Sequence, residues 1–172
     1  MTEVTVRLAT DEADIAAARM LCREWLDWHW KNYPPNWPRG DDHPMDPIAF
    51  QAILKKLPDL HERPLGGILI ASVDGKPLGC VMYGKASPGI AEFNRMFVSP
   101  DGRGHGLGRK LLDHMFEQMA ADGYKRVFYS SATFLTHARS MYENAGFAPM
   151  PHPTGFPDEW RDKVYFMERS LV

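Results

Sequence analysis

The sequence predicts a mixed α and β fold formed by a single domain of residues 1–172. A length of 172 residues is enough for one sizeable hydrophobic core. Segments with the alternating polarity of strands and segments with apolar residues at helical spacing both recur along the chain. The hydrophobic fraction of 44% and the net charge of −2 describe an ordinary globular protein, without the basic excess that favours nucleic-acid binding.

The first half of the chain is expected to contain three strands and two helices. Acidic residues from Asp11 onward suit the first turn of a helix, and the proline-rich stretch 33–40 ends it. Asp46 is expected to start a second helix, which ends before Pro58. Asp74-Gly75 is typical of a hairpin turn. The strands of this half are predicted over 4–8, 68–73 and 78–83.

The second half is expected to add three strands and two helices. Its strands are predicted over 92–98, 126–130 and 164–168, and its helices from Leu107 and through Tyr142. The proline-rich segment from Pro149 to Pro157 is expected to be a loop.

Directly before the helix at Leu107, the segment Asp101–Lys110 combines a glycine-rich turn with three cations. Each cation at a helix N-terminus faces the positive end of the helix dipole, which costs roughly 0.3–1 kcal/mol. This cost is offset if an anion such as a phosphate binds the free N–H groups there. No window matches the Walker sequence, and Leu107 stands where the dinucleotide fingerprint needs its last glycine.

The pattern that does fit is Arg103-x-x-Gly106-x-Gly108, which resembles the acetyl-CoA signature of the Gcn5-related N-acetyltransferase (GNAT) family. The preceding strand Glu92–Val98 resembles the fourth strand of that family. Ala138–Phe147, with its Tyr-Glu-x-x-Gly-Phe ending, is similar to a later helix of the family. The three blocks occur in the family's order and cover roughly residues 66–148.

The resemblance implies an α+β fold with a central, mostly antiparallel sheet of about six to seven strands and about four flanking helices. Strands four and five are expected to splay apart and admit the pantetheine arm of the cofactor. The implied activity is acetyl-CoA-dependent N-acetylation, in which a primary amine attacks acetyl-CoA directly in a ternary complex. A non-catalytic acetyl-CoA-binding sensor or interaction module is the alternative.

The resemblance also assigns a cofactor site on the fourth strand and the glycine-rich loop. Main-chain groups of the strand would pair with pantetheine, and the loop would hold the pyrophosphate. The residues concerned are Met96, Phe97, Val98, Arg103, Gly104, His105, Gly106, Leu107, Gly108 and Arg109.

Tyr142 is the candidate general acid for the departing thiolate, because a tyrosine pKa of about 10 lies above that of a thiol. A core tyrosine is the alternative, since Tyr142 belongs to an apolar helical stripe. Glu92 is the candidate general base. Strand alternation would put it on one face with Asn94, Met96 and Val98. The alternative is an exposed edge position or a salt bridge, for example to Arg95 or Arg126.

The segment from Trp25 to Trp37 is unusually aromatic, and the resemblance places it beside the acceptor cleft. Its rings could line an acceptor pocket or surround a cation. Core packing together with a dimer surface is the alternative. The residues concerned are Trp28, Trp30, Tyr33 and Trp37.

The remaining features predict a cytoplasmic protein without a metal. Asp41, Asp42, His43 and Asp46 cluster, but prolines interrupt them and aspartates commonly cap helices. Cys22 and Cys80 are expected to be buried free thiols. The N-terminus lacks the features of a signal peptide, and no apolar run could span a membrane. The expected partner is a small-molecule or protein amine, and a homodimer is the common symmetric assembly, although the sequence leaves the oligomeric state open.

Overall fold

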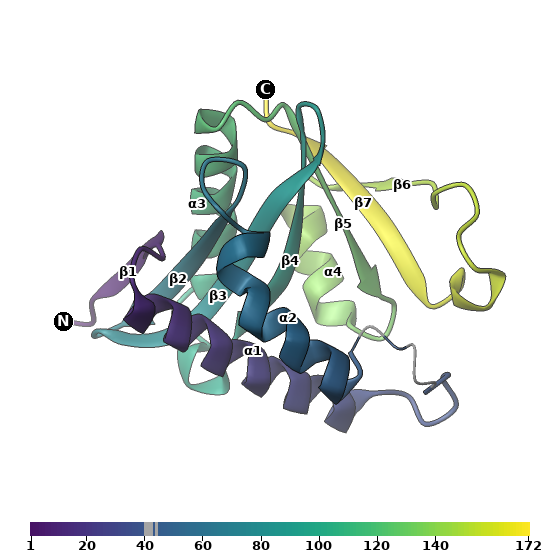
Figure 1. The fold of residues 1–172 in the computed structure, drawn as a ribbon, viewed down its shortest axis with the longest axis horizontal. Helices are drawn as coiled ribbons and strands as arrows, with labels where there is room; N and C mark the ends of the chain where they lie inside the picture. The colour runs from purple at the N-terminus through teal and green to yellow at the C-terminus, as the bar shows by residue number, and fades with distance from the viewer. Residues whose placement is uncertain (40–42, 44) are drawn as a thin grey trace.

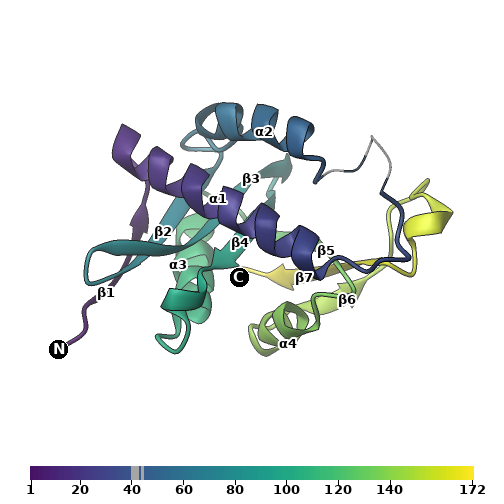
Figure 2. The same cartoon turned by 90° about the horizontal axis from the view of Figure 1, so that it is seen from below.

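A computed structural model describes residues 1–172 apart from 40–42 and 44, and its described part forms one sheet with helices on both faces (Figure 1). Helices α1 and α2 cover one face, and α3 and α4 cover the other (Figure 2). The helices are α1 (Glu12–Asn32), α2 (Pro47–Leu60), α3 (Leu107–Ala121) and α4 (Thr136–Asn144). The strands are β1 (Val4–Leu8), β2 (Gly67–Val73), β3 (Lys76–Ser87), β4 (Ile90–Val98), β5 (Arg126–Ala132), β6 (Ala148–Met150) and β7 (Val164–Ser170).

The strand order in the sheet is β1-β2-β3-β4-β5-β7-β6, and every neighbouring pair is antiparallel except β4 and β5. The parallel β4–β5 pairing covers three residue pairs, from Ile90↔Arg126 to Glu92↔Phe128. From Phe93 onward β4 has no partner on this side. We call the point where the pairing ends the fork. The mostly antiparallel sheet with separated fourth and fifth strands confirms the predicted fold class.

Helix α2 is longer than the sequence indicated, because it continues through Pro58 to Leu60. A proline inside a helix has no N–H to donate to the carbonyl four residues earlier, here that of Leu54. The guanidinium of Arg19 on α1 donates to this carbonyl instead, at 2.9 Å. The prediction that the helix ends before Pro58 is therefore wrong, and a contact between two helices explains why.

The segment from Pro149 to Pro157 is also not entirely a loop. Pro149 lies in β6, which pairs with β7 through Pro149↔Met167. Since β6 is the last strand in the sheet, proline is tolerated there, as it is on edge strands in general. The other predicted elements are present, including the hairpin turn at Asp74 and Gly75, where both residues have positive φ.

Two hydrophobic clusters lie on opposite faces of the sheet. The α3 and α4 face is packed around buried Leu111, Met115 and Tyr142, and the α1 and α2 face around Leu21 and Leu54. Cys22 and Cys80 are both buried in the second cluster as free thiols, as predicted.

Candidate active site

A β-bulge in β4 changes which side chains reach each face of the sheet. Cys80 faces Phe97 and Met82 faces Asn94, so Arg95 and Met96 both oppose Val81. Arg95 has a φ of 53°, which is a left-handed backbone conformation that residues other than glycine rarely adopt. An extra residue in one strand reverses the alternation beyond it.

The bulge corrects the predicted environment of Glu92. Phe93 before the bulge and Met96 and Val98 after it all pack with the α3-side cluster, whereas Phe97 packs with the α1-side cluster. Glu92 alternates with Phe93 and therefore faces the α1 and α2 side. The prediction that Glu92 shares a face with Met96 and Val98 is wrong, because strict alternation does not survive an inserted residue.

The guanidinium of Arg95 is held by His61, at the C-terminal end of α2. Nη2 of Arg95 lies 2.6 Å from Nε2 of His61, and Nδ1 of His61 lies 2.8 Å from the carbonyl oxygen of Tyr83. A carbonyl only accepts, so Nδ1 carries the imidazole hydrogen and Nε2 accepts from Arg95. Burial and the nearby charge of Arg95 lower the pKa of His61 to about 4. The hydrogen bond to the Tyr83 carbonyl acts in the opposite direction and raises this pKa. The bulge is thus fixed by a neutral imidazole.

The N-terminus of α3 offers free amide groups to an anion. Gly106 is the N-cap residue, and no side chain caps the helix. The N–H groups of the first helical turn, which begins at Leu107, have no carbonyl acceptor within the helix. They point out of the N-terminal end of α3. The first turn also contains no acidic residue. This end of α3 therefore suits a phosphate group.

Three glycines of the loop are needed for two different structural reasons. Gly104 and Gly106 have φ of 82° and 69°, and an added Cβ at either would meet no protein atom within 4 Å. Their role is conformational, and the space beside them is open. At Gly108 an added Cβ would lie 2.7 Å from Sδ of Met141. Gly108 therefore allows α3 and α4 to approach closely.

The cations of the loop differ in what they contact. Arg103 and Lys110 are exposed. Arg109 is exposed as well, but it also donates to the carboxylate of Asp113 at 3.0 Å and to the main-chain carbonyl of Asn144 at 3.2 Å. Arg109 thus bridges α3 to the end of α4. His105 is half-buried in the same loop.

Tyr142 lies on α4, directly against the fork. Its ring centroid is 5.4 Å from that of Phe93 and 4.3 Å from that of Tyr129, the residues that follow the last β4–β5 pair. The side chain is buried, which raises its pKa well above 10 and keeps the hydroxyl protonated. Among the described residues this hydroxyl has no hydrogen-bond partner within reach. Tyr142 is thus a buried tyrosine whose hydroxyl donates no hydrogen bond to the described residues.

Glu92 is half-buried and is the last residue of β4 that pairs with β5. Burial raises the pKa of its carboxyl group, and the charge of Arg95 opposes that rise. Within the described chain Glu92 makes no ion pair, since Arg126 binds Glu168 at 2.8 Å and Arg95 binds His61. A carboxylate with a raised pKa beside the fork can accept a proton.

The aromatic segment at the end of α1 joins rings from three other loops. We call this set the aromatic cluster. It contains His29, Trp30, Tyr33, Trp37, His43, Phe134 and Trp160, with neighbouring ring centroids about 5–6 Å apart. Of the four predicted residues, Trp30, Tyr33 and Trp37 belong to it, whereas Trp28 packs on the α1-side core instead. His43, Phe134 and Trp160 were not predicted, because loops outside the aromatic segment bring them to it, and His29 lies within that segment but was not among the predicted residues.

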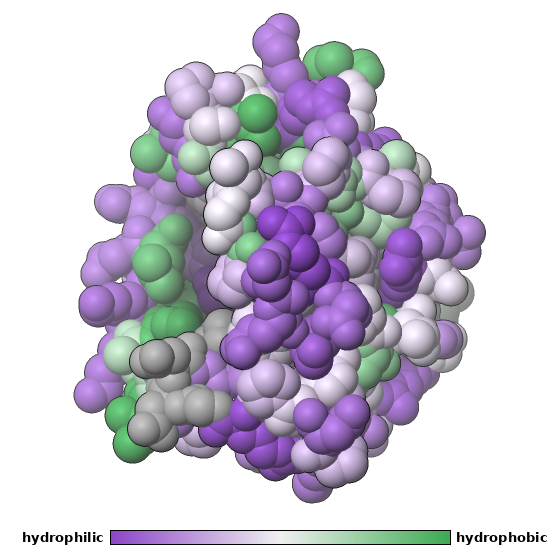
Figure 3. Space-filling view, turned by 90° about the vertical axis from the view of Figure 1, so that its right-hand side faces the viewer, coloured by the Kyte–Doolittle hydropathy of each residue, from purple (hydrophilic) through white to green (hydrophobic). Residues whose placement is uncertain are grey.

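The cluster lies on the Glu92 side of the sheet and beyond the fork. Phe134 follows the end of β5, and Trp160 precedes β7, so both rings come from segments at the end of β5 that no longer pairs with β4. None of the large hydrophobic side chains that are exposed in the described chain is aromatic. The surface seen from the β6 and β7 side is mostly hydrophilic, with apolar patches scattered over it (Figure 3). The rings are therefore turned toward one another.

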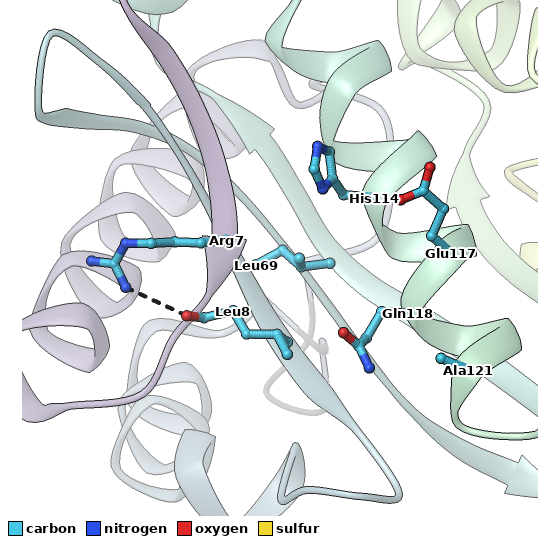
Figure 4. A pocket seen from close by; sticks show the side chains of 7 residues that line it. All are labelled: Arg7, Leu8, Leu69, His114, Glu117, Gln118 and Ala121. Atoms are coloured by element: carbon cyan, nitrogen blue, oxygen red, sulfur yellow. Dashed lines mark hydrogen bonds between the residues drawn. The ribbon is translucent and has the colours of Figure 1, made fainter.

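Three further features of the described residues bear on function. No helix there could span a membrane, and no three His, Cys, Asp or Glu side chains gather as metal ligands do. Of the candidate metal residues, Asp46 caps α2, and Asp41 and Asp42 lie outside the described residues. A pocket of about 380 Å³ between β1 and α3 contains none of the predicted site residues (Figure 4).

Known proteins resemble this chain in sequence and in fold. The sequence model of the Acetyltransferase (GNAT) family matches residues 22–147. The N-acetyltransferase YjgM of Escherichia coli K12, itself uncharacterized, is 28% identical over 106 residues, which is 59% of this chain and 63% of that protein. The chain thus spans less than two thirds of the length of that relative.

Solved structures of similar fold cover nearly the whole chain. A GNAT-family acetyltransferase of Staphylococcus aureus Mu50 superposes with a TM-score of 0.73 and 17% identity, over 99% of this chain and 100% of that one. The acetyltransferase yncA of Salmonella typhimurium, solved with its cofactor acetyl-CoA, superposes with a TM-score of 0.66 and 18% identity, over 98% of this chain and 94% of that one.

Proposed function

The chain belongs to the acetyltransferase (GNAT) family, and on that premise we propose that it transfers an acetyl group from acetyl-CoA to a primary amine in a ternary complex. The observation that carries this proposal is the fork. It has a protonated tyrosine on one face of the sheet and a carboxylate of raised pKa on the other. Acetyl-CoA supplies the acetyl group as a thioester.

The α3 and α4 side of the fork suits the cofactor. The free amides from Gly104 to Arg109 and the positive end of the α3 dipole would hold the pyrophosphate, with Arg103 adding charge. Residues Met96 to Val98 have no strand on the β5 side, so their main-chain groups are free to pair with the pantetheine arm. The side chains of these three residues are packed in the two cores. The three residues would therefore bind the cofactor through their main-chain groups.

The two candidate catalytic residues divide the proton transfers. Glu92 takes a proton from the ammonium, directly or through water, so that the amine nitrogen can attack the thioester carbon. The N–C bond forms, the C–S bond breaks, and the electron pair of that bond leaves on sulfur. Tyr142 donates its proton to the sulfur, and the second proton that the nitrogen loses as the amide forms returns to Tyr142 through solvent. Burial keeps Tyr142 protonated for this step, and the unpaired hydroxyl leaves the proton available.

Release of free thiol from acetyl-CoA, followed over a panel of amines, tests the activity. Tyr142→Phe is expected to lower kcat by about 100-fold, the scale of general acid catalysis, while acetyl-CoA affinity stays within about twofold. Tyr124→Phe is the matched control, since its hydroxyl binds the carbonyl of Leu65 away from the fork. Full activity of Tyr142→Phe would remove the acid assignment. Binding of acetyl-CoA without turnover of any amine would favour the sensor instead.

Glu92→Gln tests the base in the same assay. If Glu92 accepts the proton, kcat/KM of the wild type falls at low pH as this carboxylate becomes protonated. The variant should lose this acid limb of the pH profile. An unchanged acid limb would assign the base elsewhere.

A further inference from the structure

One buried polar side chain of the aromatic cluster has no partner. His29 is 5% exposed, and both of its ring nitrogens are buried without a hydrogen-bond partner among the described residues. Burial and the nearby His43 lower its pKa to about 4, so the ring is neutral near pH 7. Leaving a buried imidazole unpaired costs about 1–3 kcal/mol. Such a group requires an explanation.

The polar side chains of the cluster that pack around His29, those of Trp30, Tyr33 and His43, are paired. Nδ1 of His43 accepts from the Met45 N–H at 3.0 Å, so its Nε2 carries the hydrogen and donates to the Tyr33 hydroxyl at 3.1 Å. Tyr33 in turn donates to the carbonyl of Pro38 at 2.5 Å, and Trp30 donates to the carbonyl of Met45 at 2.9 Å. These bonds fix the rings around His29. None of them involves the His29 nitrogens, which therefore remain available to a ligand.

The cover over His29 is made of side chains from separate loops. Phe134 meets the imidazole edge to face at 5.3 Å, and Trp37 meets Phe134 in the same way at 5.3 Å. Trp160 completes this outer layer 6.4 Å from Trp37. An aromatic ring from a ligand that takes the place of Phe134 would keep the edge-to-face contacts. It would also bring a polar ring atom to His29.

The charge at the rim selects against a second cation. The guanidinium of Arg39 lies over the rings of Tyr33 and Trp30, with its carbon 5.1 and 5.7 Å from the centroids. Its positive charge repels an extra ammonium group, so a polyamine is disfavoured.

We propose that the aromatic cluster selects the acceptor, which is an aromatic monoamine whose ring carries a hydroxyl or N–H group that pairs with His29. This inference rests on the proposed function, because the amine of such a ligand would extend toward Glu92 and the fork. His29 is a specificity residue in this assignment. A site built to bond a polar atom of its substrate rejects an analogue that lacks it.

Three probes of similar length test the assignment: tyramine, phenethylamine and hexylamine. The wild-type protein is expected to have a kcat/KM for tyramine about tenfold or more above that for phenethylamine, with hexylamine lower still. In His29→Phe the preference for tyramine over phenethylamine should disappear, mainly through KM. Trp37→Leu should lower kcat/KM for both aromatic amines, whereas Trp28→Leu, a neighbouring tryptophan outside the cluster, should not.

Binding without chemistry separates this proposal from the proposed function. Tyramine affinity is measured by calorimetry in the presence of CoA, for wild type and for each variant whose thermal unfolding shows that it is folded. Tyramine binding that His29→Phe weakens, without any turnover, would support the pocket and refute the transferase. Turnover of hexylamine as fast as tyramine, unaffected by Trp37→Leu and His29→Phe, would overturn the pocket and leave the transferase. Absence of both binding and turnover would overturn both.

Discussion

Replacing His29 by phenylalanine should make the protein less sensitive to acid. A histidine whose folded-state pKa is depressed takes up its proton first in the unfolded state, so stability falls as pH drops through the ordinary pKa. For His29 the ordinary value is 6.5 and the folded value is about 4. At about 1.4 kcal/mol per pKa unit, the wild-type protein should lose about 2–3 kcal/mol between pH 7 and pH 4.5 from this group alone. His61, which has the same folded pKa, adds to the loss.

Urea unfolding at pH 7 and at pH 4.5, followed by circular dichroism, measures this difference. His29→Phe should retain about 2–3 kcal/mol more of its free energy of unfolding over this interval than the wild type does. At pH 7 the variant should be about as stable as wild type, because an apolar ring replaces an unpaired polar one. His137→Gln, which changes an exposed histidine, is the control. Parallel losses in wild type and His29→Phe would refute the burial of a neutral, unpaired imidazole.

Three further substitutions test the fold around the site. Arg19→Met should lower the free energy of unfolding by about 1–3 kcal/mol, measured by thermal unfolding, because the Leu54 carbonyl loses its donor. Arg23→Met, on the same helix, should lower it little. Equal effects of the two substitutions would contradict the role of Arg19. Gly106→Ala should cost about 1 kcal/mol because it forces a left-handed φ on alanine, and unchanged stability in the same assay would show that the loop relaxes. Gly108→Val should cost about 1–3 kcal/mol and raise the KM for acetyl-CoA, because the side chain meets Met141, and a variant with wild-type stability and KM would show that the methionine moves aside without consequence.

The sequence predicted most elements because their signals are local. Capping residues, hairpin glycines and apolar periodicity located α1, the β2–β3 turn and α3 without reference to the rest of the chain. The end of α2 was misplaced because Pro58 is tolerated only through a contact with Arg19 on another helix. Similarly, β6 was missed because Pro149 is acceptable only on an edge strand, which is a property of the sheet.

The candidate site divides in the same way. The glycine spacing and the blocks on either side of it predicted a phosphate loop and a candidate acid at Tyr142 from neighbouring residues alone. The bulge at Arg95 carries no such signal, since the residue with positive φ is not a glycine. The aromatic cluster depends on contacts between residues more than 90 positions apart, such as His29 with Phe134. Periodicity within one segment contains no information about these contacts.

The bulge and the fork together determine where a reaction could take place in this chain. A bulge strengthens the local twist of a strand, and β4 separates from β5 immediately before the one at Arg95. The rings of Phe93, Tyr129 and Tyr142 fill the apex of the separation on one face. Glu92 occupies the same level on the other face, on the side of the aromatic cluster. A donor that enters from the α3 and α4 side and an acceptor from the α1 and α2 side can therefore meet where β4 and β5 no longer bond each other. Since that position depends on backbone pairing, a variant that restored the β4–β5 ladder would remove the site without changing any candidate catalytic residue.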